Sequence, residues 1–209
     1  MSTDARTDEE CMAAYQGGDA TAFRTLATRH HAPVYRFCLR ALKNPEAAAD
    51  AAQEVFLRVV KNAPTWEKRA KFTTWLYTIA RNFCVDEARK GRFRKTESLD
   101  ENVANPRGEA TSERKIDRVV SPGAAPDVQV ADQMRGTRLH AAIESAVALL
   151  PEEQREVFLL REGGDLGFSQ IAEITGVGEN TVKSRMRYAL GTLRRALGDA
   201  GFFPEPDVG

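Results

Sequence analysis

The stretch SQIAEITGVGENTVKSRMRYALGTLRR, residues 169–195, is the most informative part of this chain for its fold. Ser169 can cap a short helix and Gly176 can end it, because glycine readily adopts the left-handed conformation that often follows a helix. A longer helix is expected next, and its apolar residues recur at spacings of three and four: Val182, Met186, Ala189, Leu190, Leu193 and Leu197. Two helices joined by a tight glycine-containing turn, the second long and basic, are typical of a helix-turn-helix.

The face of the second helix opposite this apolar stripe is basic and polar. Residues 181–195 hold five Lys or Arg and no Asp or Glu, although the chain of 209 residues balances 30 basic against 30 acidic side chains. One α-helix fits the major groove of B-DNA, where Arg and Lys read guanine and where Ser and Asn offer adaptable hydrogen bonds. The first turns of such a helix supply base contacts, so the predicted residues are Asn180, Thr181, Lys183, Ser184 and Arg187, with Arg185 on phosphate. The alternative is a solvated basic face, which the preceding helix and turn disfavour.

Residues 20–90 show three more apolar stripes with helical spacing. The first, from Phe23 to Leu42, contains Pro33, which is expected to start a new turn or kink the helix. The second follows Pro45, which suits a first helical turn, and the third covers residues 72–88. No segment alternates with period two for long enough to indicate a strand. The chain is therefore predicted to be all-α, with two small helical domains: a bundle of three or four helices, then the helix-turn-helix domain.

The third stripe is accompanied by residues that suit single-stranded nucleic acid. The loop NAPTWEKRAK, residues 62–71, sets a tryptophan among cations, and unpaired bases stack on aromatic rings while cations follow the phosphates. The candidates are Trp66, Lys68, Arg69 and Lys71 in the loop and Thr74, Tyr77, Arg81, Asn82 and Arg89 on the helix. For Trp66 the alternative is a packing role, because aromatic side chains more often fill interiors.

The segment DAAQEVFLRVV, residues 50–60, combines an apolar stripe with polar residues outside it. Asp50, Gln53, Glu54 and Arg58 form either a solvated polar face or a surface that docks on a partner helix.

The composition changes between the two helical units. Residues 96–134 carry eight acidic and four basic side chains, a net charge of −4, and the segment is rich in Pro, Gly and Ser. Such a composition disfavours a packed core, so we expect a long, acidic and largely irregular linker. The predicted organisation is an N-terminal segment 1–20, a first domain 21–95, a linker 96–136, a helix-turn-helix domain 137–198 and a tail 199–209.

Other residue types exclude several classes of protein. The three cysteines are far apart in the sequence, so a CxxC redox pair and a zinc knuckle are ruled out, and reduced, mostly buried thiols are expected. No stretch approaches the roughly 18 consecutive apolar residues that cross a membrane, and no secretory leader is recognisable. We expect a cytoplasmic protein without membrane insertion. HExxH and nucleophile-elbow motifs are absent, so no catalytic residue, metal ligand or cofactor is predicted.

These pieces, in this order, resemble the extracytoplasmic-function (ECF) group of bacterial RNA polymerase sigma factors, in the sigma-70 family. DAAQEVFLRVV and FTTWLYTIARNFCVDEARK look like that group's region two, and LPEEQREVFLLREGGDLGFSQIAEITGVGENTVKSRMRYAL looks like its region four. The resemblance implies a protein that is not an enzyme but binds core RNA polymerase, recognises minus-thirty-five and minus-ten promoter elements and promotes DNA melting. An anti-sigma factor is the further partner that it implies.

The resemblance also implies roles for individual segments. Segment 50–60 binds the clamp helices of the largest polymerase subunit, with expected contacts at Asp50, Gln53, Glu54, Phe56, Leu57 and Arg58. Segment 72–90 and loop 62–71 capture the melted non-template strand of the minus-ten element, and the loop is the expected pocket for a flipped base. Region four binds the polymerase flap and the duplex minus-thirty-five element. Tyr188 belongs to that duplex surface, although relatives often carry a basic residue there.

Two alternatives remain open from the sequence. A helix-turn-helix regulator that binds duplex DNA without acting as a polymerase subunit accounts for residues 169–195, but not for the segments that resemble region two. The acidic linker either occupies a path toward the RNA-exit channel or is a plain flexible tether.

Overall fold

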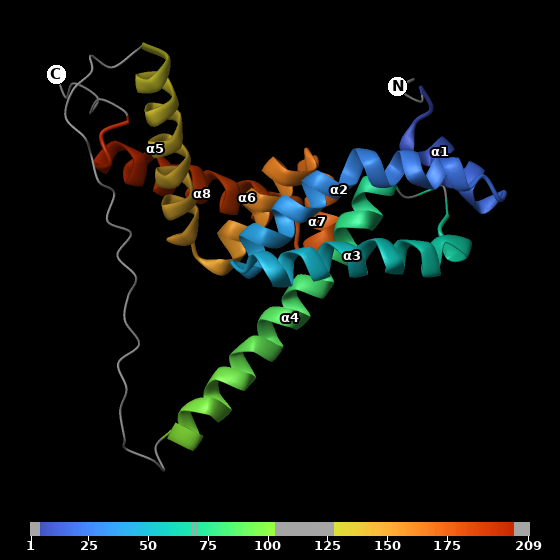
Figure 1. Cartoon of the computed structure of the whole chain (residues 1–209), viewed down its shortest axis with the longest axis horizontal. Coiled ribbons are helices and arrows are strands. Elements are labelled where there is room, and N and C mark those ends of the chain that lie inside the picture. Colours follow the sequence, from blue (N-terminus) through green and yellow to red (C-terminus); the bar gives the residue numbers. More distant parts are fainter. Residues whose placement is uncertain (1–4, 68, 70, 103–127, 203–209) are drawn as a thin grey trace.

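The computed structural model describes residues 5–67, 69, 71–102 and 128–202, and the regular elements in these ranges are all helical (Figure 1). The all-α fold predicted from the sequence is thereby confirmed. The first unit contains α1 (Asp8–Gln16), α2 (Ala20–Leu42), α3 (Pro45–Asn62), the short 3-10 helix η1 (Ala63–Thr65) and α4 (Phe72–Asn102). The second unit contains α5 (Val128–Ala148), α6 (Glu152–Gly164), α7 (Phe168–Thr175) and α8 (Glu179–Asp199).

The first three helices begin at residues whose side chains cap them. Thr7 and Glu10 form a capping box at α1, in which the backbone N–H of Glu10 donates to Thr7 Oγ1 over 3.2 Å and the backbone N–H of Thr7 donates to Glu10 Oε2 over 2.7 Å. Asp19 and Asn44 accept hydrogen bonds from first-turn N–H groups of α2 and α3. These caps satisfy donors that a helix leaves without internal partners. Pro45 occupies the first turn of α3, as predicted.

Two features of the first unit differ from the sequence-based expectation. Pro33 lies inside α2, which continues on both sides of it, so of the two predicted effects the start of a new turn is wrong and the kink stays a prediction. The helix persists because its apolar stripe is buried on both sides of the proline, at Leu26 and Val34. The N-terminal segment 1–20 also contributes a helix, α1, whose Cys11 and Met12 are fully buried in the core.

The helix-turn-helix consists of α7 and α8. Gly176 ends α7 in the left-handed region at φ 71°, as predicted. The predicted cap at Ser169 is wrong, because α7 already begins at Phe168. The backbone N–H of Gly167 donates to Gln170 Oε1 over 3.0 Å and stabilises this earlier first turn.

The apolar stripe of α8 packs against the other helices of its unit. Val182, Met186, Ala189 and Leu193 are buried, in agreement with the prediction. Leu190 is a correction, because it is 52% exposed. It lies at the edge of the stripe, whose centre is covered by α5, α6 and α7.

Helices extend into both ends of the predicted linker, residues 96–136. The backbone of α4 continues to Asn102, and α5 begins at Val128. Residues 91–102 are rich in Arg, Lys and Glu, which favour helix. The rest of the predicted linker, residues 103–127, lies outside the described residues, as do residues 203–209 of the predicted tail.

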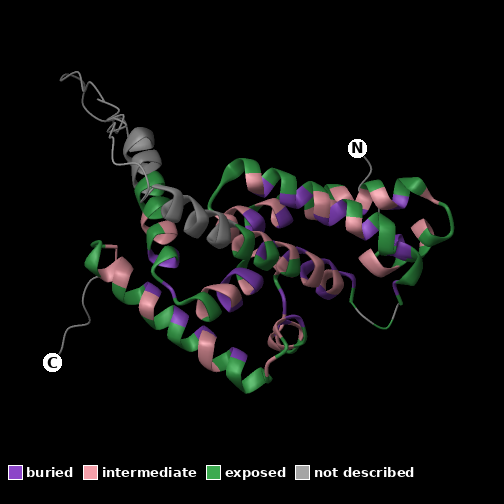
Figure 2. Cartoon of the chain, turned by 90° about the horizontal axis from the view of Figure 1, so that it is seen from below, coloured by how far each residue is buried: buried purple, intermediate pink, exposed green. Residues whose placement is uncertain are grey.

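One hydrophobic core extends through both units (Figure 2). Helices α2 and α4 contact α6, and α4 also contacts α7. Phe37 in α2 and Leu166, between α6 and α7, are both buried in this shared core. The two units are therefore packed against each other, with α1 and α8 toward opposite ends and the second half of α4 projecting away (Figure 1). Of the helices described, none combines the length and apolar character needed to span a membrane.

Candidate nucleic-acid interface

The predicted reading face of α8 is accessible. Asn180, Thr181, Lys183, Arg187 and Tyr188 are exposed, and Ser184 and Arg185 are half-buried. Lys183 Nζ lies 2.6 Å from Glu179 Oε1, one turn earlier on the same helix. An exposed pair of this kind contributes little to stability, so Lys183 can exchange its carboxylate partner for a phosphate at small cost. The structure thus brings the seven predicted residues together on one helix.

Arg187 and Tyr188 form a pair on this face. The guanidinium carbon of Arg187 lies 5.3 Å from the centre of the Tyr188 ring, which is a cation–π contact. Tyr188 itself is 57% exposed. Tyr188 carries no charge at a position where a basic residue was expected. Its ring instead holds the guanidinium of the neighbouring Arg187 in place.

The predicted single-strand face of α4 is largely covered. Thr74 is 3% exposed and Tyr77 is 1% exposed, and Arg81 is half-buried. Asn82 and Arg89, farther along the helix, are exposed. The sequence prediction placed these residues on one polar face, and the structure shows that part of this face is packed against protein.

The partners of the covered residues come from the second unit. Three hydrogen bonds join the units here: Gln170 Nε2 to Thr74 Oγ1 over 2.8 Å, Tyr77 Oη to the carbonyl of Gly163 over 2.6 Å, and Arg81 Nε to Glu156 Oε1 over 2.7 Å. Burial raises the pKa of the Tyr77 hydroxyl above its ordinary value, so this group remains a donor. None of these contacts between units was predicted from the sequence.

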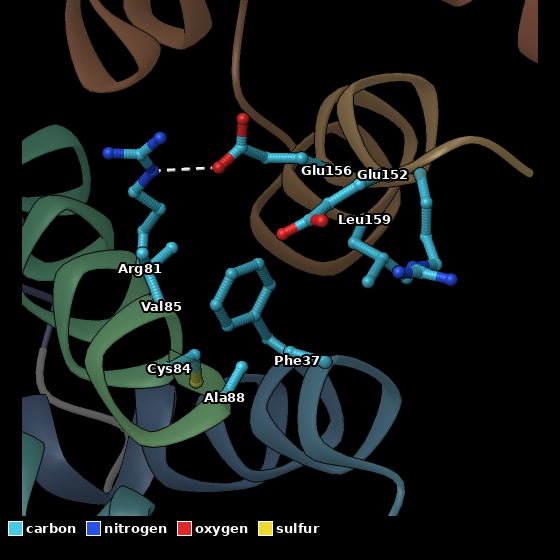
Figure 3. Close-up of a pocket in the computed structure, with 10 residues that line it drawn as sticks. Phe37, Arg81, Cys84, Val85, Ala88, Glu152, Glu156 and Leu159 are labelled. Carbon is cyan, nitrogen blue, oxygen red and sulfur yellow. Dashed lines mark hydrogen bonds and ion pairs between the residues drawn. The ribbon is translucent and has the colours of Figure 1, made fainter. Parts of the chain in front are cut away.

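A small pocket lies beside the Arg81–Glu156 pair, among α2, α4 and α6 (Figure 3). Its volume is about 70 Å³, and Phe37 and Cys84 contribute to its lining. The neighbouring Cys38 thiol, together with burial, raises the pKa of the Cys84 thiol. The three cysteines are buried, as predicted. In the described ranges, no group of three or more His, Cys, Asp or Glu could hold a metal ion.

The loop before α4 directs its tryptophan inward. Trp66 is 6% exposed, and its Nε1 is buried without a hydrogen-bond partner among the described residues. Gln16 of α1 holds the loop, because its Nε2 donates to the carbonyls of Ala63 and Trp66 over 2.8 and 2.9 Å. Trp66 thus occupies the packing position that was the alternative to base stacking. Of the predicted loop cations, Arg69 and Lys71 are exposed, and Lys68 lies outside the described residues.

The predicted partner-docking segment forms one wall of a groove between α2 and α3. Leu57 and Val60 line this groove and are 55% and 39% exposed. Phe56 is buried beneath them, with its ring edge-on to Phe23 at 6.5 Å. His31 stacks on the Phe56 ring at 6.0 Å from the other wall.

Of the polar residues of the same segment, only Gln53 lines the groove, and Arg58 lies toward α4. Asp50 and Gln53 are exposed, and Glu54 and Arg58 are half-buried. Arg58 Nε donates to Glu54 Oε1 over 2.8 Å, and the Arg58 guanidinium lies 5.0 Å from the centre of the Phe83 ring. An apolar groove that Gln53 also lines suits the apolar face of a partner helix.

Comparison with known proteins identifies relatives of both units. The family model for Sigma-70 region 2 matches residues 26–94, and that for Sigma-70, region 4 matches residues 140–193. The ECF RNA polymerase sigma factor SigW of Bacillus subtilis is 31% identical over 182 residues, which cover 87% of this chain and 92% of SigW. The ECF RNA polymerase sigma factor RpoE of Cereibacter sphaeroides is 32% identical over 181 residues, with coverages of 86% and 88%.

Two solved structures have a similar fold. CnrH, in complex with the cytosolic domain of CnrY, gives a TM-score of 0.62 at 19% identity and covers 92% of this chain and 97% of its own. The sigma factor RpoE of Bartonella quintana, in complex with the anti-sigma factor NepR, gives a TM-score of 0.60 at 20% identity, with coverages of 84% and 96%.

Proposed function

The chain belongs to the extracytoplasmic-function group of RNA polymerase sigma factors, and from that membership we propose how its surfaces act in transcription initiation. As a sigma factor it binds core RNA polymerase, recognises minus-thirty-five and minus-ten promoter elements and promotes melting of promoter DNA. The observation that carries this function is the presence of region two (residues 26–94) and region four (residues 140–193) in one chain.

We infer that α8 reads the duplex minus-thirty-five element. Asn180, Thr181, Lys183, Ser184 and Arg187 contact base edges in the major groove, and Arg185 contacts phosphate. The support is the exposed, cation-rich face of α8 in a helix-turn-helix whose other face is buried. Tyr188 completes the surface by restraining Arg187.

We assign the melted non-template strand of the minus-ten element to α4 and the loop before it. Arg69, Lys71, Asn82 and Arg89 are exposed in this conformation. Thr74, Tyr77 and Arg81 belong to the same assignment, although region four covers them here. Lys68 lies outside the described residues, and we assign it to the melted strand from its place in loop 62–71. Trp66 supports the loop from inside instead of stacking on a base.

The groove between α2 and α3 is the proposed site for the polymerase clamp helices. Leu57 supplies exposed apolar surface over Phe56 and Gln53 lines the groove, while Asp50 and the Glu54–Arg58 pair are assigned polar contacts outside it. Region four is proposed to contact the polymerase flap.

Three further assignments follow from family membership. We propose that the protein acts without catalysing a reaction, that it works in the cytoplasm, and that an anti-sigma factor binds it, as the anti-sigma factor NepR binds RpoE of Bartonella quintana.

The proposed boundaries are residues 21–95 for the region-two domain, 96–136 for the linker and 137–198 for the region-four domain, with α1 of segment 1–20 packed on the first domain. A regulator that binds only duplex DNA is disfavoured, because it would not need region two.

The test combines the purified protein with sigma-free core polymerase and fragmented genomic DNA, followed by sequencing of the transcripts. We expect transcripts whose start sites share upstream minus-thirty-five and minus-ten elements, and none with core enzyme alone. Duplex binding by the protein without any transcript would support the regulator instead.

A further inference from the structure

Helix α1 contacts both elements beside the loop that precedes α4, which are η1 and α4 itself (Figure 1). Gln16 makes the first contact, because its Nε2 donates to the carbonyls of Ala63 and Trp66 over 2.8 and 2.9 Å. Glu9 makes the second, because its Oε1 accepts a hydrogen bond from the backbone N–H of Phe72 over 3.0 Å. One helix therefore holds the loop at both of its ends.

The contact at Glu9 supplies a cap that α4 does not provide for itself. Lys71 precedes the first residue of α4, and its carbonyl accepts the backbone N–H of Trp75 over 3.2 Å, as the carbonyl of an N-cap residue does. A lysine side chain has no acceptor, so it cannot satisfy the first N–H groups of the helix. The Glu9 carboxylate accepts from one of them, and a negative charge is favoured at a helix N-terminus. The beginning of α4 thus depends on α1.

The two anchoring residues lie on one side of α1. Glu9 and Gln16 are close to two helical turns apart, so their side chains leave the same face, about 10 Å from each other along the axis. Met12 lies between them and is fully buried. A hydrogen bond joins Asp8 to His30 of α2. Because α1 is fixed in this way, its anchors hold a constant position relative to the first domain.

We propose that Glu9 and Gln16 are positioning residues for the minus-ten element, which set how strictly the loop discriminates between bases of the melted strand. The proposal rests on the strand-binding role given above to the loop and to its exposed cations Arg69 and Lys71. A site rejects a wrong base when its polar groups cannot move to meet that base and are left unpaired. Two fixed ends keep the loop backbone in one geometry and lower the cost of ordering it on binding.

The two anchors offer isosteric exchanges with opposite expected results. Glu9→Gln keeps an oxygen that can accept from the Phe72 N–H, whereas Gln16→Glu replaces the donor by a carboxylate that repels the two loop carbonyls. Glu9→Ala removes the acceptor altogether. Glu153→Gln, at an exposed acid of α6, is the control for loss of a charge.

The measurement is transcription in vitro by core polymerase and the full-length protein. The templates are a promoter that the wild-type protein transcribes and copies of it with single-base substitutions. Discrimination at a position is the ratio of the initial rates from the original and the substituted promoter. We expect Glu9→Ala and Gln16→Glu to lower this ratio about fivefold at one or more minus-ten positions, roughly the contribution of one hydrogen bond.

The minus-thirty-five positions provide an internal control, because α8 is proposed to read them. Discrimination there should stay at the wild-type value in every variant, and Glu9→Gln and Glu153→Gln should match wild type at both elements. A variant that is partly unfolded transcribes less from every promoter, but its ratios do not change. A loss confined to the minus-ten ratios therefore reports positioning and not stability.

The outcomes separate this proposal from the proposed function. Unchanged ratios at every minus-ten position in both Glu9→Ala and Gln16→Glu overturn the positioning role and leave the sigma-factor function intact. Equal losses at the minus-ten and minus-thirty-five elements also overturn it, as do equal losses in Glu9→Gln and Glu9→Ala, which would assign the effect to charge. Absence of transcripts from wild-type protein contradicts the proposed function and, with it, this inference.

Discussion

Asp8 Oδ2 lies 2.6 Å from His30 Nε2, so the first turn of α1 is tied to the middle of α2. Arg29 donates to the other oxygen of the same carboxylate over 2.8 Å. The hydrogen bond from His30, with a further contribution from Arg29, holds the pKa of Asp8 below its ordinary value of 3.8. A lowered folded-state pKa means that the carboxylate stabilises the fold above about pH 4, and that this contribution is lost as the pH falls through the folded-state value.

We therefore expect Asp8→Asn to lower the free energy of unfolding by about 1 kcal/mol at neutral pH. The difference from wild type should shrink below about pH 4. Urea unfolding at a series of pH values measures it, with Asp86→Asn, an exposed acid on α4, as the control. A difference that stays constant from neutral to acidic pH contradicts the assignment.

Removing the ring of Tyr188 should weaken binding to the minus-thirty-five duplex. Arg187 is held over that ring at 5.3 Å, and an exposed cation–π contact contributes about 0.5–1 kcal/mol. Tyr188→Ala is thus expected to reduce duplex affinity about threefold, whereas Tyr188→Phe keeps the ring and should retain wild-type affinity. Electrophoretic mobility shift or anisotropy measurements decide this. Equal losses in both variants would indicate that the hydroxyl, not the ring face, contacts DNA.

Shortening Leu57 should weaken polymerase binding without weakening the fold. Leu57 is 55% exposed in the α2–α3 groove, so Leu57→Ala should change the free energy of unfolding by less than about 0.5 kcal/mol. Burial of the side chain against a clamp helix is worth about 1–2 kcal/mol, or roughly tenfold in affinity for core polymerase. Leu149→Ala, at a 70% exposed leucine outside the groove, is the control. Similar losses of polymerase affinity in both variants would argue against the groove as the docking site.

Gln16→Ala should loosen the loop that precedes α4. The Gln16 amide is the donor to two loop carbonyls, at Ala63 and Trp66, and partly buried acceptors left without a donor cost about 1–3 kcal/mol. We expect a lower free energy of unfolding and faster amide hydrogen exchange in residues 62–71. Thr28→Ala, which removes an exposed hydroxyl from α2, provides the comparison. Unchanged exchange in the loop would show that Trp66 packing alone holds it.

Local chemistry explains why much of the fold could be predicted from the sequence. Gly176 ends α7 and Pro45 begins α3 through the conformation of one or two residues, and the buried stripe of α8 follows from helical spacing. These three features could therefore be predicted without knowledge of tertiary contacts. Leu190 shows the limit of periodicity, because only the neighbouring helices determine how wide a stripe is covered. Helix α1 is short, and its place in the core depends on contacts with α2 and α4.

The covered face of α4 could not be predicted for a different reason. Thr74, Tyr77 and Arg81 have the composition of a ligand-binding surface, and polar composition does not distinguish a nucleic acid from another part of the same chain. Their partners Glu156 and Gln170 are 75 and 96 residues away in the sequence. Trp66 posed the same ambiguity on a smaller scale, and its side chain is buried in this structure.

The ion pair between Arg81 and Glu156 joins residues that lie 75 positions apart in the sequence. Arg81 has a proposed role in strand binding as well as a contact with region four, so its replacement affects both. Glu156 is placed only in the contact, so alleles at its codon report on the packing of the two units alone, and a genetic screen can tell the two roles of Arg81 apart.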